Sequence, residues 1–190
     1  MTTTVAQQRL LDAAVEAFAE QGYHGTTTRD IASRAQRSPA AVYIHHESKE
    51  DLLFAVSLRG HQEALAVLES AFGSTDDPTE RLQRMVYEFS LWHLRNAQVG
   101  RVVQYELRAL RGDHREAVIN LRHRFEELMV QALRSGERSG AFAQLDVGAA
   151  GRALLSLGID LVRWFEAAPG RDAEAVARAN VDFAMRIVRP

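Results

Sequence analysis

The spacing of apolar residues predicts helices along the whole chain. In the first segment, from about Val5 to Glu20, the apolar residues Leu11, Val15 and Phe18 recur at intervals of three or four, which places them on one helical face. No segment shows the alternation of apolar and polar residues that a half-buried strand requires. Glycine, proline and short polar clusters separate the helix-length pieces. The pattern therefore predicts an all-α protein.

Local capping signals place two short helices after the first one. Gly22 is a suitable stop for the first helix. Thr27 and Asp30 have the spacing of a capping box, which satisfies free backbone N–H groups at a helix start. Ser38 followed by Pro39 is a good N-cap followed by proline at the first helical position, and this short helix would run to about His45. The first of these two helices would bury three apolar residues: Ile31, Ala32 and Ala35.

The rest of the chain is predicted to hold longer helices. Ser48 to Asp51 reads as another capping box and opens a helix from about Lys49 to Phe72. A loop follows from Gly73 to Pro78. Polar and glycine-containing breaks at Ser135 to Gly140 and at Pro169-Gly170 separate later helices. These breaks give five further helices, over roughly 78–96, 98–111, 114–135, 146–167 and 172–188.

Composition is that of an ordinary globular protein. The 190 residues are 46% hydrophobic and 25% charged, and no apolar run reaches the roughly 18 residues that span a bilayer. The first twenty residues are amphipathic, unlike a signal peptide. Cysteine is absent, which excludes disulfides, thiolate nucleophiles and Cys-ligated zinc. We therefore expect a cytoplasmic protein with no membrane partner.

The charge pattern allows nucleic-acid binding only through a local patch. The net charge is −2, so the chain as a whole is not a polycation. Of the 23 lysines and arginines, Lys49 alone is lysine. Between residues 24 and 49, however, four basic residues outweigh two acidic ones and give a local balance of +2. The basic residues are Arg29, Arg34, Arg37 and Lys49, and the acidic ones are Asp30 and Glu47.

Two short helices joined by a tight turn, after a longer helix, form a candidate helix-turn-helix. Ala32 is small where the two helices would cross, and Ile31, Ala35 and Val42 could form their shared core. The second helix would then be free to enter the major groove of DNA. From this pattern alone two other classes stay open. One is a helical-bundle enzyme or carrier with an incidental helix pair, and the other is an architectural DNA-binding dimer without a ligand.

Residues 10–56 resemble the N-terminal domain of TetR-type regulators. The matching motifs are Gly22-Tyr23, the block from Thr27 to Ala32, Ser38, the pair Val42-Tyr43 and the block from Ser48 to Leu53. The resemblance implies an N-terminal three-helix helix-turn-helix domain, residues 1–47, and a C-terminal ligand-sensing and dimerisation domain, residues 48–190. It further implies a homodimeric repressor on a palindromic operator, released by a small hydrophobic effector.

The resemblance also implies which residues contact DNA. Thr28, Tyr43, His45 and Lys49 would meet the DNA backbone or groove edge. Four residues around the start of the second short helix would lie closest to the bases: Arg37, Ser38, Pro39 and Ala40. Arg29 is a further candidate through its charge, with a solvated helical face as the alternative.

Three positions depart from the family pattern. The turn has Gln36 and Arg37 where the family usually has glycine and a small apolar residue. We therefore expect a left-handed glutamine at a cost of about 1 kcal/mol. His46 replaces a usual aromatic residue. The run from His45 to Glu47 lacks the spacing of a metal site. With no phosphate-binding glycine loop and no nucleophile elbow either, we predict no metal, no cofactor and no catalytic residue.

The C-terminal half contains aromatic residues at helical spacing, which serve either core packing or a ligand cavity. It resembles TetR-type regulators that respond to acyl-CoA thioesters, through Glu106 to Leu110, Arg122, Gly136, Gly140 to Phe142, and Trp164-Phe165 ahead of Pro169-Gly170. An acyl chain needs an apolar cavity, for which the candidates are Phe89, Trp92, Phe125, Met129 and Ile159. The CoA phosphates need arginines, and Arg108, Arg122 and Arg163 are candidates, with ordinary surface charge as the alternative.

Small residues on the penultimate helix indicate close helix packing. They are Gly151, Ala153, Ser156 and Gly158, which we interpret as a dimer seam. A bulky change such as Gly158→Leu is expected to break the dimer or to misfold the chain.

Overall fold

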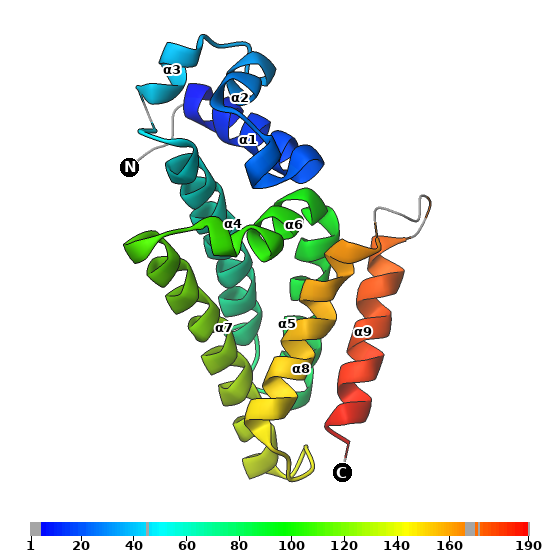
Figure 1. Ribbon diagram of the computed structural model, residues 1–190. Coiled ribbons are helices and arrows are strands. Elements are labelled where there is room, and N and C mark those ends of the chain that lie inside the picture. Colours follow the sequence, from blue (N-terminus) through cyan, green and yellow to red (C-terminus); the bar gives the residue numbers. More distant parts are fainter. Residues whose placement is uncertain (1–4, 45, 166–169, 171, 190) are drawn as a thin grey trace. The chain divides into compact units, whose positions relative to one another are not determined.

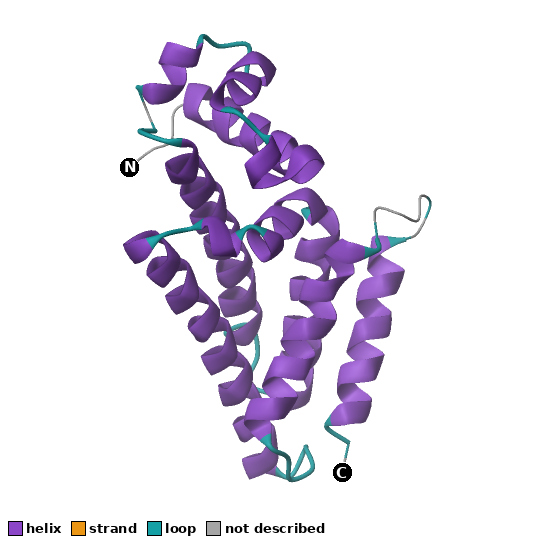
Figure 2. Cartoon of the chain, viewed as in Figure 1, coloured by secondary structure: helices purple, strands orange, loops and turns teal. Residues whose placement is uncertain are grey.

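The computed structural model describes residues 5–44, 46–165, 170 and 172–189. Within these residues the chain is helical and contains no strand, which confirms the predicted all-α class (Figures 1 and 2). No helix in this part of the chain is both long and apolar enough to cross a membrane. The α-helices are α1 Val5–Gly25, α2 Thr28–Arg34, α3 Pro39–Tyr43, α4 Lys49–Phe72, α5 Pro78–Arg95, α6 Ala97–Tyr105, α7 Gly112–Ser139, α8 Val147–Ile159 and α9 Ala173–Ile187, and two 3₁₀ turns are η1 Leu107–Ala109 and η2 Asp160–Arg163.

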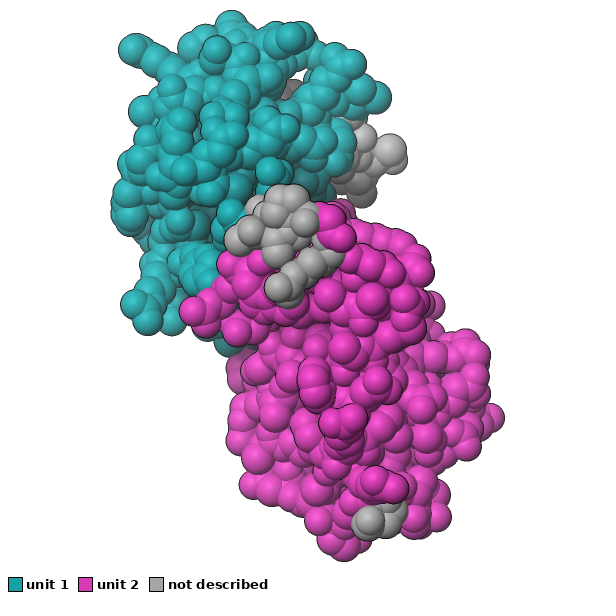
Figure 3. All heavy atoms as spheres, turned by 90° about the vertical axis from the view of Figure 1, so that its right-hand side faces the viewer, with its two compact units in different colours: residues 1–61, 98–119 teal, residues 62–97, 120–190 magenta. Residues whose placement is uncertain are grey.

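The chain divides into two compact units (Figure 3). Unit 1 comprises Met1–His61 and Gln98–Ile119, and unit 2 comprises Gln62–Ala97 and Asn120–Pro190. Helices α4 and α7 each contribute residues to both units. Each unit has its own apolar core, as a compact unit requires.

The core of unit 1 forms where α1, α2, α3 and the first half of α4 turn their apolar faces inward. Phe18 of α1, Ile31 of α2 and Val42 of α3 are fully buried in one cluster. These are the positions that the helical spacing placed on buried faces. The three helices of the predicted helix-turn-helix therefore share a core, and Figure 1 shows them adjacent to one another.

The capping signals read from the sequence are present at the helix starts of unit 1. The Thr27 hydroxyl accepts from the N–H of Asp30 at 3.2 Å, and the Asp30 carboxylate accepts from the N–H of Thr27 at 2.8 Å. The Thr27 hydroxyl also donates to the Asp30 carboxylate at 2.6 Å, and this bond, together with the one from the N–H of Thr27, holds the pKa of Asp30 below its ordinary value. The Ser38 hydroxyl caps α3 by accepting from the N–H of Ala41 at 3.3 Å.

The start of α4 differs from the predicted capping box in one respect. The Ser48 hydroxyl accepts from the N–H of Asp51 at 3.0 Å, as expected. The Asp51 carboxylate, however, accepts from the N–H of Glu47 at 3.2 Å and also lies 3.2 Å from Nδ1 of His46. Asp51 therefore ties the segment before α4 to the helix.

Three predicted helix ends differ from the structure. The first helix continues past Glu20 to Gly25 through a break at Gly22, whose φ is 70°. The helix predicted over 98–111 ends at Tyr105 and is followed by the 3₁₀ turn η1. The helix predicted over 146–167 ends at Ile159 and is followed by η2. In all three places, glycine or short-range turns change the backbone hydrogen bonding inside a continuous apolar pattern.

The break predicted at Ser135 to Gly140 was wrong for most of its length, because α7 continues to Ser139. Gly136 lies inside the helix and packs against Phe142, since a Cβ at Gly136 would lie 1.9 Å from Cδ2 of that ring. The chain turns at Gly140, whose φ of 76° is left-handed. Gly136 thus serves side-chain packing, whereas Gly140 ends the helix.

In unit 2, α5 packs chiefly against α9 and α8 (Figure 1). The interpretation of the glycines of α8 as a dimer seam is corrected by this packing. A Cβ at Gly158 would lie 2.7 Å from Cδ1 of Phe89, and one at Gly151 would lie 3.5 Å from Val130 of the same subunit. Both glycines therefore face the subunit core, whereas Ala153 and Ser156 are exposed.

Candidate DNA-binding surface and effector site

The turn between α2 and α3 has the left-handed residue that the sequence predicted. Gln36 has a φ of 55°, and it is the non-glycine residue with positive φ in the described part of the chain. The turn is closed by backbone bonds from the N–H of Gln36 to Ser33 and from the N–H of Arg37 to Ala32, at 3.1 and 2.9 Å. The turn thus forms without glycine, at the steric cost of a left-handed side chain.

The start of α3 presents an open surface. Arg37, Ser38, Pro39 and Ala40 are all exposed, while Val42 on the opposite side is fully buried. The hydroxyl of Ser38 caps the helix, so its freedom to reach a base is limited by that bond. The exposed helix start is the part of a recognition helix that approaches base edges.

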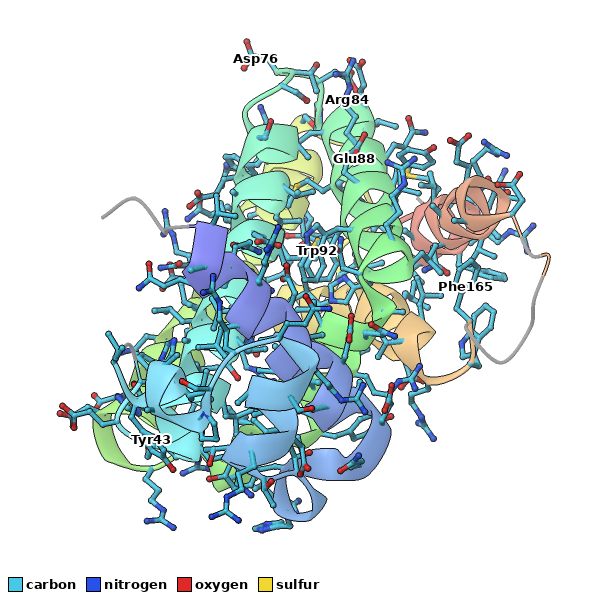
Figure 4. All side chains as sticks on the ribbon, turned by 90° about the horizontal axis from the view of Figure 1, so that it is seen from above. Tyr43, Asp76, Arg84, Glu88, Trp92 and Phe165 are labelled. Atoms are coloured by element: carbon cyan, nitrogen blue, oxygen red, sulfur yellow. The ribbon has the colours of Figure 1, made fainter. Side chains whose placement is uncertain are left out.

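Thr28 and Tyr43 lie side by side although 15 residues separate them. Their hydroxyl oxygens are 3.1 Å apart, at the start of α2 and the end of α3. Tyr43 is 53% exposed and points outward in Figure 4. Arg29 is exposed next to Thr28. A hydroxyl pair beside a cation at a helix N-terminus is suited to binding a phosphate oxygen. The fourth predicted backbone contact, His45, lies outside the described residues.

Lys49 makes contacts that its sequence position did not predict. Its ammonium donates to the carbonyl oxygens of Tyr23 and Thr26, both at 2.7 Å, and lies 4.3 Å from the centre of the Tyr23 ring. It therefore holds the start of α4 against the end of α1. A DNA contact would have to use the remaining N–H of the same ammonium group.

Two further residues in this unit face the protein. Arg34 of α2 pairs with Glu20 of α1 and lies 3.9 Å from Glu16, and the hydrogen bond from Arg34 holds the pKa of Glu20 below its ordinary value. Arg34 and Arg29 are both exposed, but the guanidinium of Arg34 is held by these carboxylates of α1. His46 is buried at the position where the family has an aromatic residue and contacts Asp51, so the imidazole fills that place.

Unit 1 also holds long-range carboxylate contacts that sequence reasoning missed. Glu106 accepts from the N–H of Tyr23 at 3.1 Å. Glu50 accepts from the N–H of Arg111 at 3.0 Å and lies 2.9 Å from Nδ1 of His114, whose ring stacks on Phe54 at 3.9 Å. These partners are 60 or more residues apart, so no local spacing could indicate them. They tie the segment after α6 to α1 and α4 inside unit 1.

In unit 2, the structure brings together the five apolar residues proposed for the effector. They all belong to one cluster, in which Phe89, Phe125 and Met129 are buried and Trp92 and Ile159 are partly buried. The rings of Phe89 and Phe125 meet edge to face, with centres 5.7 Å apart. Figure 4 shows Arg84, Glu88 and Trp92 in one row along α5, as their spacing of four residues requires.

The three candidate arginines have different environments. Arg122 of α7 is partly buried, and desolvation lowers the pKa of its guanidinium. Arg163 is exposed and lies 3.3 Å from Asp160, which is an ordinary surface ion pair. Arg108 is exposed and belongs to unit 1. Of the three arginines, Arg122 is therefore the one whose side chain is partly shielded from solvent.

Two surface grooves lie elsewhere in unit 2. One, of about 530 Å³, lies between α4 and α5, and the other, of about 480 Å³, lies between α5 and α9. None of the eight predicted effector residues lines these two grooves. Within the described residues there is no group of three or more His, Cys, Asp or Glu side chains that could hold a metal ion.

Comparison with known sequences identifies both halves of the chain. Residues 10–56 match the profile described as bacterial regulatory proteins of the tetR family, and residues 75–188 match a tetracyclin repressor-like C-terminal domain. The repressor KstR2 of Mycobacterium tuberculosis is 34% identical over 160 residues, which covers 82% of this chain and 79% of that protein.

Solved structures share the fold. A tetR-family regulatory protein from Rhodococcus RHA1 has a TM-score of 0.93 and 38% identity, and the match covers 98% of each chain. The regulator AibR, solved with isovaleryl coenzyme A and operator DNA, has a TM-score of 0.84 at 21% identity, covering 93% of this chain and 96% of that one.

Proposed function

Since the chain belongs to the TetR family of bacterial transcriptional regulators, we propose that this repressor binds a palindromic operator as a homodimer and is released by an acyl-CoA thioester. The observation that carries the DNA-binding part is the exposed start of α3 beside the Thr28–Tyr43 hydroxyl pair. Residues 1–47 would form the DNA-binding domain and residues 48–190 the effector and dimerisation domain. Helix α4 contributes to both compact units, so it offers a continuous connection through which effector binding would change DNA binding.

The DNA-binding proposal assigns different tasks to Tyr43 and Arg37. Tyr43 would contact phosphate together with Thr28, so Tyr43→Ala should weaken binding to all DNA sequences and reduce the salt dependence of the affinity. Arg37 would reach a base edge, so Arg37→Ala should change the preference among operator variants. Both quantities come from electrophoretic shifts at several salt concentrations. A Tyr43→Ala protein with the affinity and salt slope of the unmodified protein would contradict this placement.

The dimer proposal rests on an exposed apolar stripe of α9. Residues four apart on this helix form one exposed row, namely Ala175, Ala179, Phe183 and Ile187. Small exposed residues of α8 offer a second surface that another helix could approach closely: Ala149, Ala153 and Ser156. A two-fold dimer would bury both, which suits a symmetric operator.

Phe183 is the residue to test, because it is 50% exposed on a helix that faces no described partner there. Phe183→Asp should convert a dimer into a monomer at micromolar concentration in sedimentation experiments. Tyr105→Asp is the matched control, since Tyr105 is 52% exposed but lies on another helix, α6, and belongs to unit 1. A protein that is monomeric without any substitution would refute the dimer proposal.

The effector proposal rests on the apolar cluster around Phe89 and on the partly buried Arg122. An acyl chain would replace apolar contacts in the cluster, and a desolvated guanidinium would gain from an anionic phosphate. The structural relative AibR, which was solved with isovaleryl coenzyme A, supports this ligand class by analogy of fold.

The test compares octanoyl-CoA with octanoate in calorimetric titration and in release from operator DNA. The thioester should bind and release DNA, whereas the free acid should do so far more weakly because it lacks the phosphates. Arg122→Met should reduce the affinity for octanoyl-CoA and leave that for octanoate unchanged. Equal binding of thioester and acid would refute the acyl-CoA class while leaving the repressor function intact.

A further inference from the structure

Helix α3 turns one side to the core of unit 1 and the other side to solvent. Val42 is fully buried, whereas Ala40 is exposed and Ile44, which directly follows the helix, is 75% exposed. Ile44 keeps helical backbone angles, with a φ of −65° and a ψ of −31°. At about 100° per residue, Ala40 and Ile44 therefore share a face on the side of α3 opposite Val42. We call this pair the outer face of α3.

The outer face of α3 is apolar. Alanine and isoleucine have neither a hydrogen-bond donor nor an acceptor in their side chains. The hydroxyl groups next to this face are already engaged, because Ser38 caps the helix and the Tyr43 oxygen lies 3.1 Å from that of Thr28. In the stretch from Arg37 to Ile44, Arg37 is the charged residue. This surface therefore offers bases an apolar contact, with one cation ahead of the helix.

Ile44 belongs to none of the three apolar clusters of the described residues. A single exposed apolar side chain is ordinary on a protein surface. This one, however, directly follows Tyr43, whose hydroxyl forms with that of Thr28 the pair proposed to meet a DNA phosphate. Burying such a side chain against another apolar group is favourable. On bound DNA, that apolar group has to come from the nucleic acid.

The major groove presents one apolar group, the C5-methyl of thymine, among the hydrogen-bonding groups of the bases. We propose that Ala40 and Ile44 recognise thymine methyl groups, so that the operator is read at these positions by apolar contact and not by hydrogen bonds. This inference rests on the DNA-binding function proposed above. An apolar side chain placed against cytosine N4 or guanine O6 would leave that group desolvated without a partner, which disfavours those bases.

The spacing of the two residues limits where the thymines can lie. Ala40 and Ile44 are four residues apart, or about 6 Å along the helix. Successive base pairs are about 3.4 Å apart along the duplex, so the two A·T pairs would be one or two steps apart in each half-site. Arg37, ahead of the helix, is the side chain that can donate to O6 and N7 of a guanine beside them.

The experiment first selects an operator from random double-stranded DNA with the full chain. Each thymine of that operator is then replaced in turn by uracil, which keeps the pairing with adenine and removes only the methyl group. At two positions of each half-site the affinity should fall about fourfold per methyl group removed, the effect expected for one buried methyl. With cytosine at those positions, 5-methylcytosine should restore about the same factor, because it returns the methyl group.

Substitutions assign the two methyl contacts to their residues. Ile44→Ala should remove the preference for thymine over uracil at one position and leave it at the other. Ala40→Ser, which replaces the contacting methyl by a polar group, should do the reverse. Both side chains are exposed, so neither change should alter the melting temperature. Val5→Ala is the matched control, since Val5 is 73% exposed but lies on α1, and it should leave both preferences unchanged.

Three results would overturn the inference and leave the repressor function intact. The first is a selected operator that binds equally well with uracil at every position. The second is a preference for thymine that persists in both Ile44→Ala and Ala40→Ser, since other residues would then contact the methyl groups. The third is an Ile44→Ala protein that loses the same affinity on thymine and uracil operators, which would place Ile44 against the sugar-phosphate backbone. If the unmodified chain selects no DNA sequence, the proposed function itself fails, and the inference fails with it.

Discussion

Gly136 gives the sharpest test of how the core of unit 2 is packed. Alanine at a helix interior is ordinarily better than glycine by about 1 kcal/mol, so Gly136→Ala would stabilise an isolated α7. In the folded protein the new methyl group would lie 1.9, 2.1 and 2.5 Å from three atoms of the Phe142 ring. Phe142 is only 4% exposed and cannot swing aside without leaving the core.

The expected free-energy changes follow from these two opposing effects. Overpacking a core costs about 1–3 kcal/mol, and contacts this short place Gly136→Ala at or above the upper end. After the helix gain of about 1 kcal/mol is subtracted, a net loss of about 2 kcal/mol remains. Phe142→Ala alone should cost about 3–5 kcal/mol, because it empties a buried site. In that background the methyl group meets no ring, so Gly136→Ala should stabilise by about 1 kcal/mol.

The assay is urea unfolding followed by circular dichroism, at one protein concentration for all four proteins because the proposed dimer makes stability concentration-dependent. The double-mutant cycle should give a coupling energy of about 3 kcal/mol, with a change of sign for Gly136→Ala between the two backgrounds. A cost that is the same with and without Phe142 would refute the packing explanation, since the loss would then come from the backbone.

Three shorter predictions concern single side chains. Gln36→Gly should stabilise the fold by up to about 1 kcal/mol, read from the urea midpoint, because glycine adopts the φ of 55° without a Cβ clash; a lower midpoint would contradict it. Lys49→Met should lower the melting temperature through two lost hydrogen bonds of about 1 kcal/mol each, and an unchanged value would mean that water replaces them. Burial lowers the pKa of His93 to about 4 in the folded protein, against an ordinary value of 6.5. Unfolding therefore takes up a proton below pH 6.5, and the free energy of unfolding should fall by about 3 kcal/mol between pH 6.5 and 4. This acid-dependent loss should be absent in His93→Phe.

The parts of the fold that could be predicted depend on interactions between near neighbours. Thr27 and Asp30 are three residues apart, so their capping box was readable from the sequence. The left-handed turn at Gln36 followed from its place in a recognised motif. Gly136 was misread as a helix break, because its partner Phe142 reaches it only when the chain folds back.

In the candidate sites, too, some features followed from the sequence pattern and others depended on contacts between distant segments. The resemblance singled out five apolar residues that do share one cluster, whereas helical spacing alone favoured core packing over a cavity for each of them. Gly158 was assigned to a dimer seam because small residues permit close packing of either kind, and only the position of Phe89 decides between them. The ties made by Glu106 and Glu50 join segments that no local pattern relates.

The position of Lys49 also makes its rate of chemical modification a measure of local opening of the fold. It is the single lysine among 190 residues, and its ammonium is held by two carbonyl oxygens at the end of α1. An amine-reactive reagent needs the free, deprotonated amine, so it can modify this side chain only while those bonds are open. The rate of acylation at one site, read by mass spectrometry, therefore measures how often α4 separates from α1, with no introduced label.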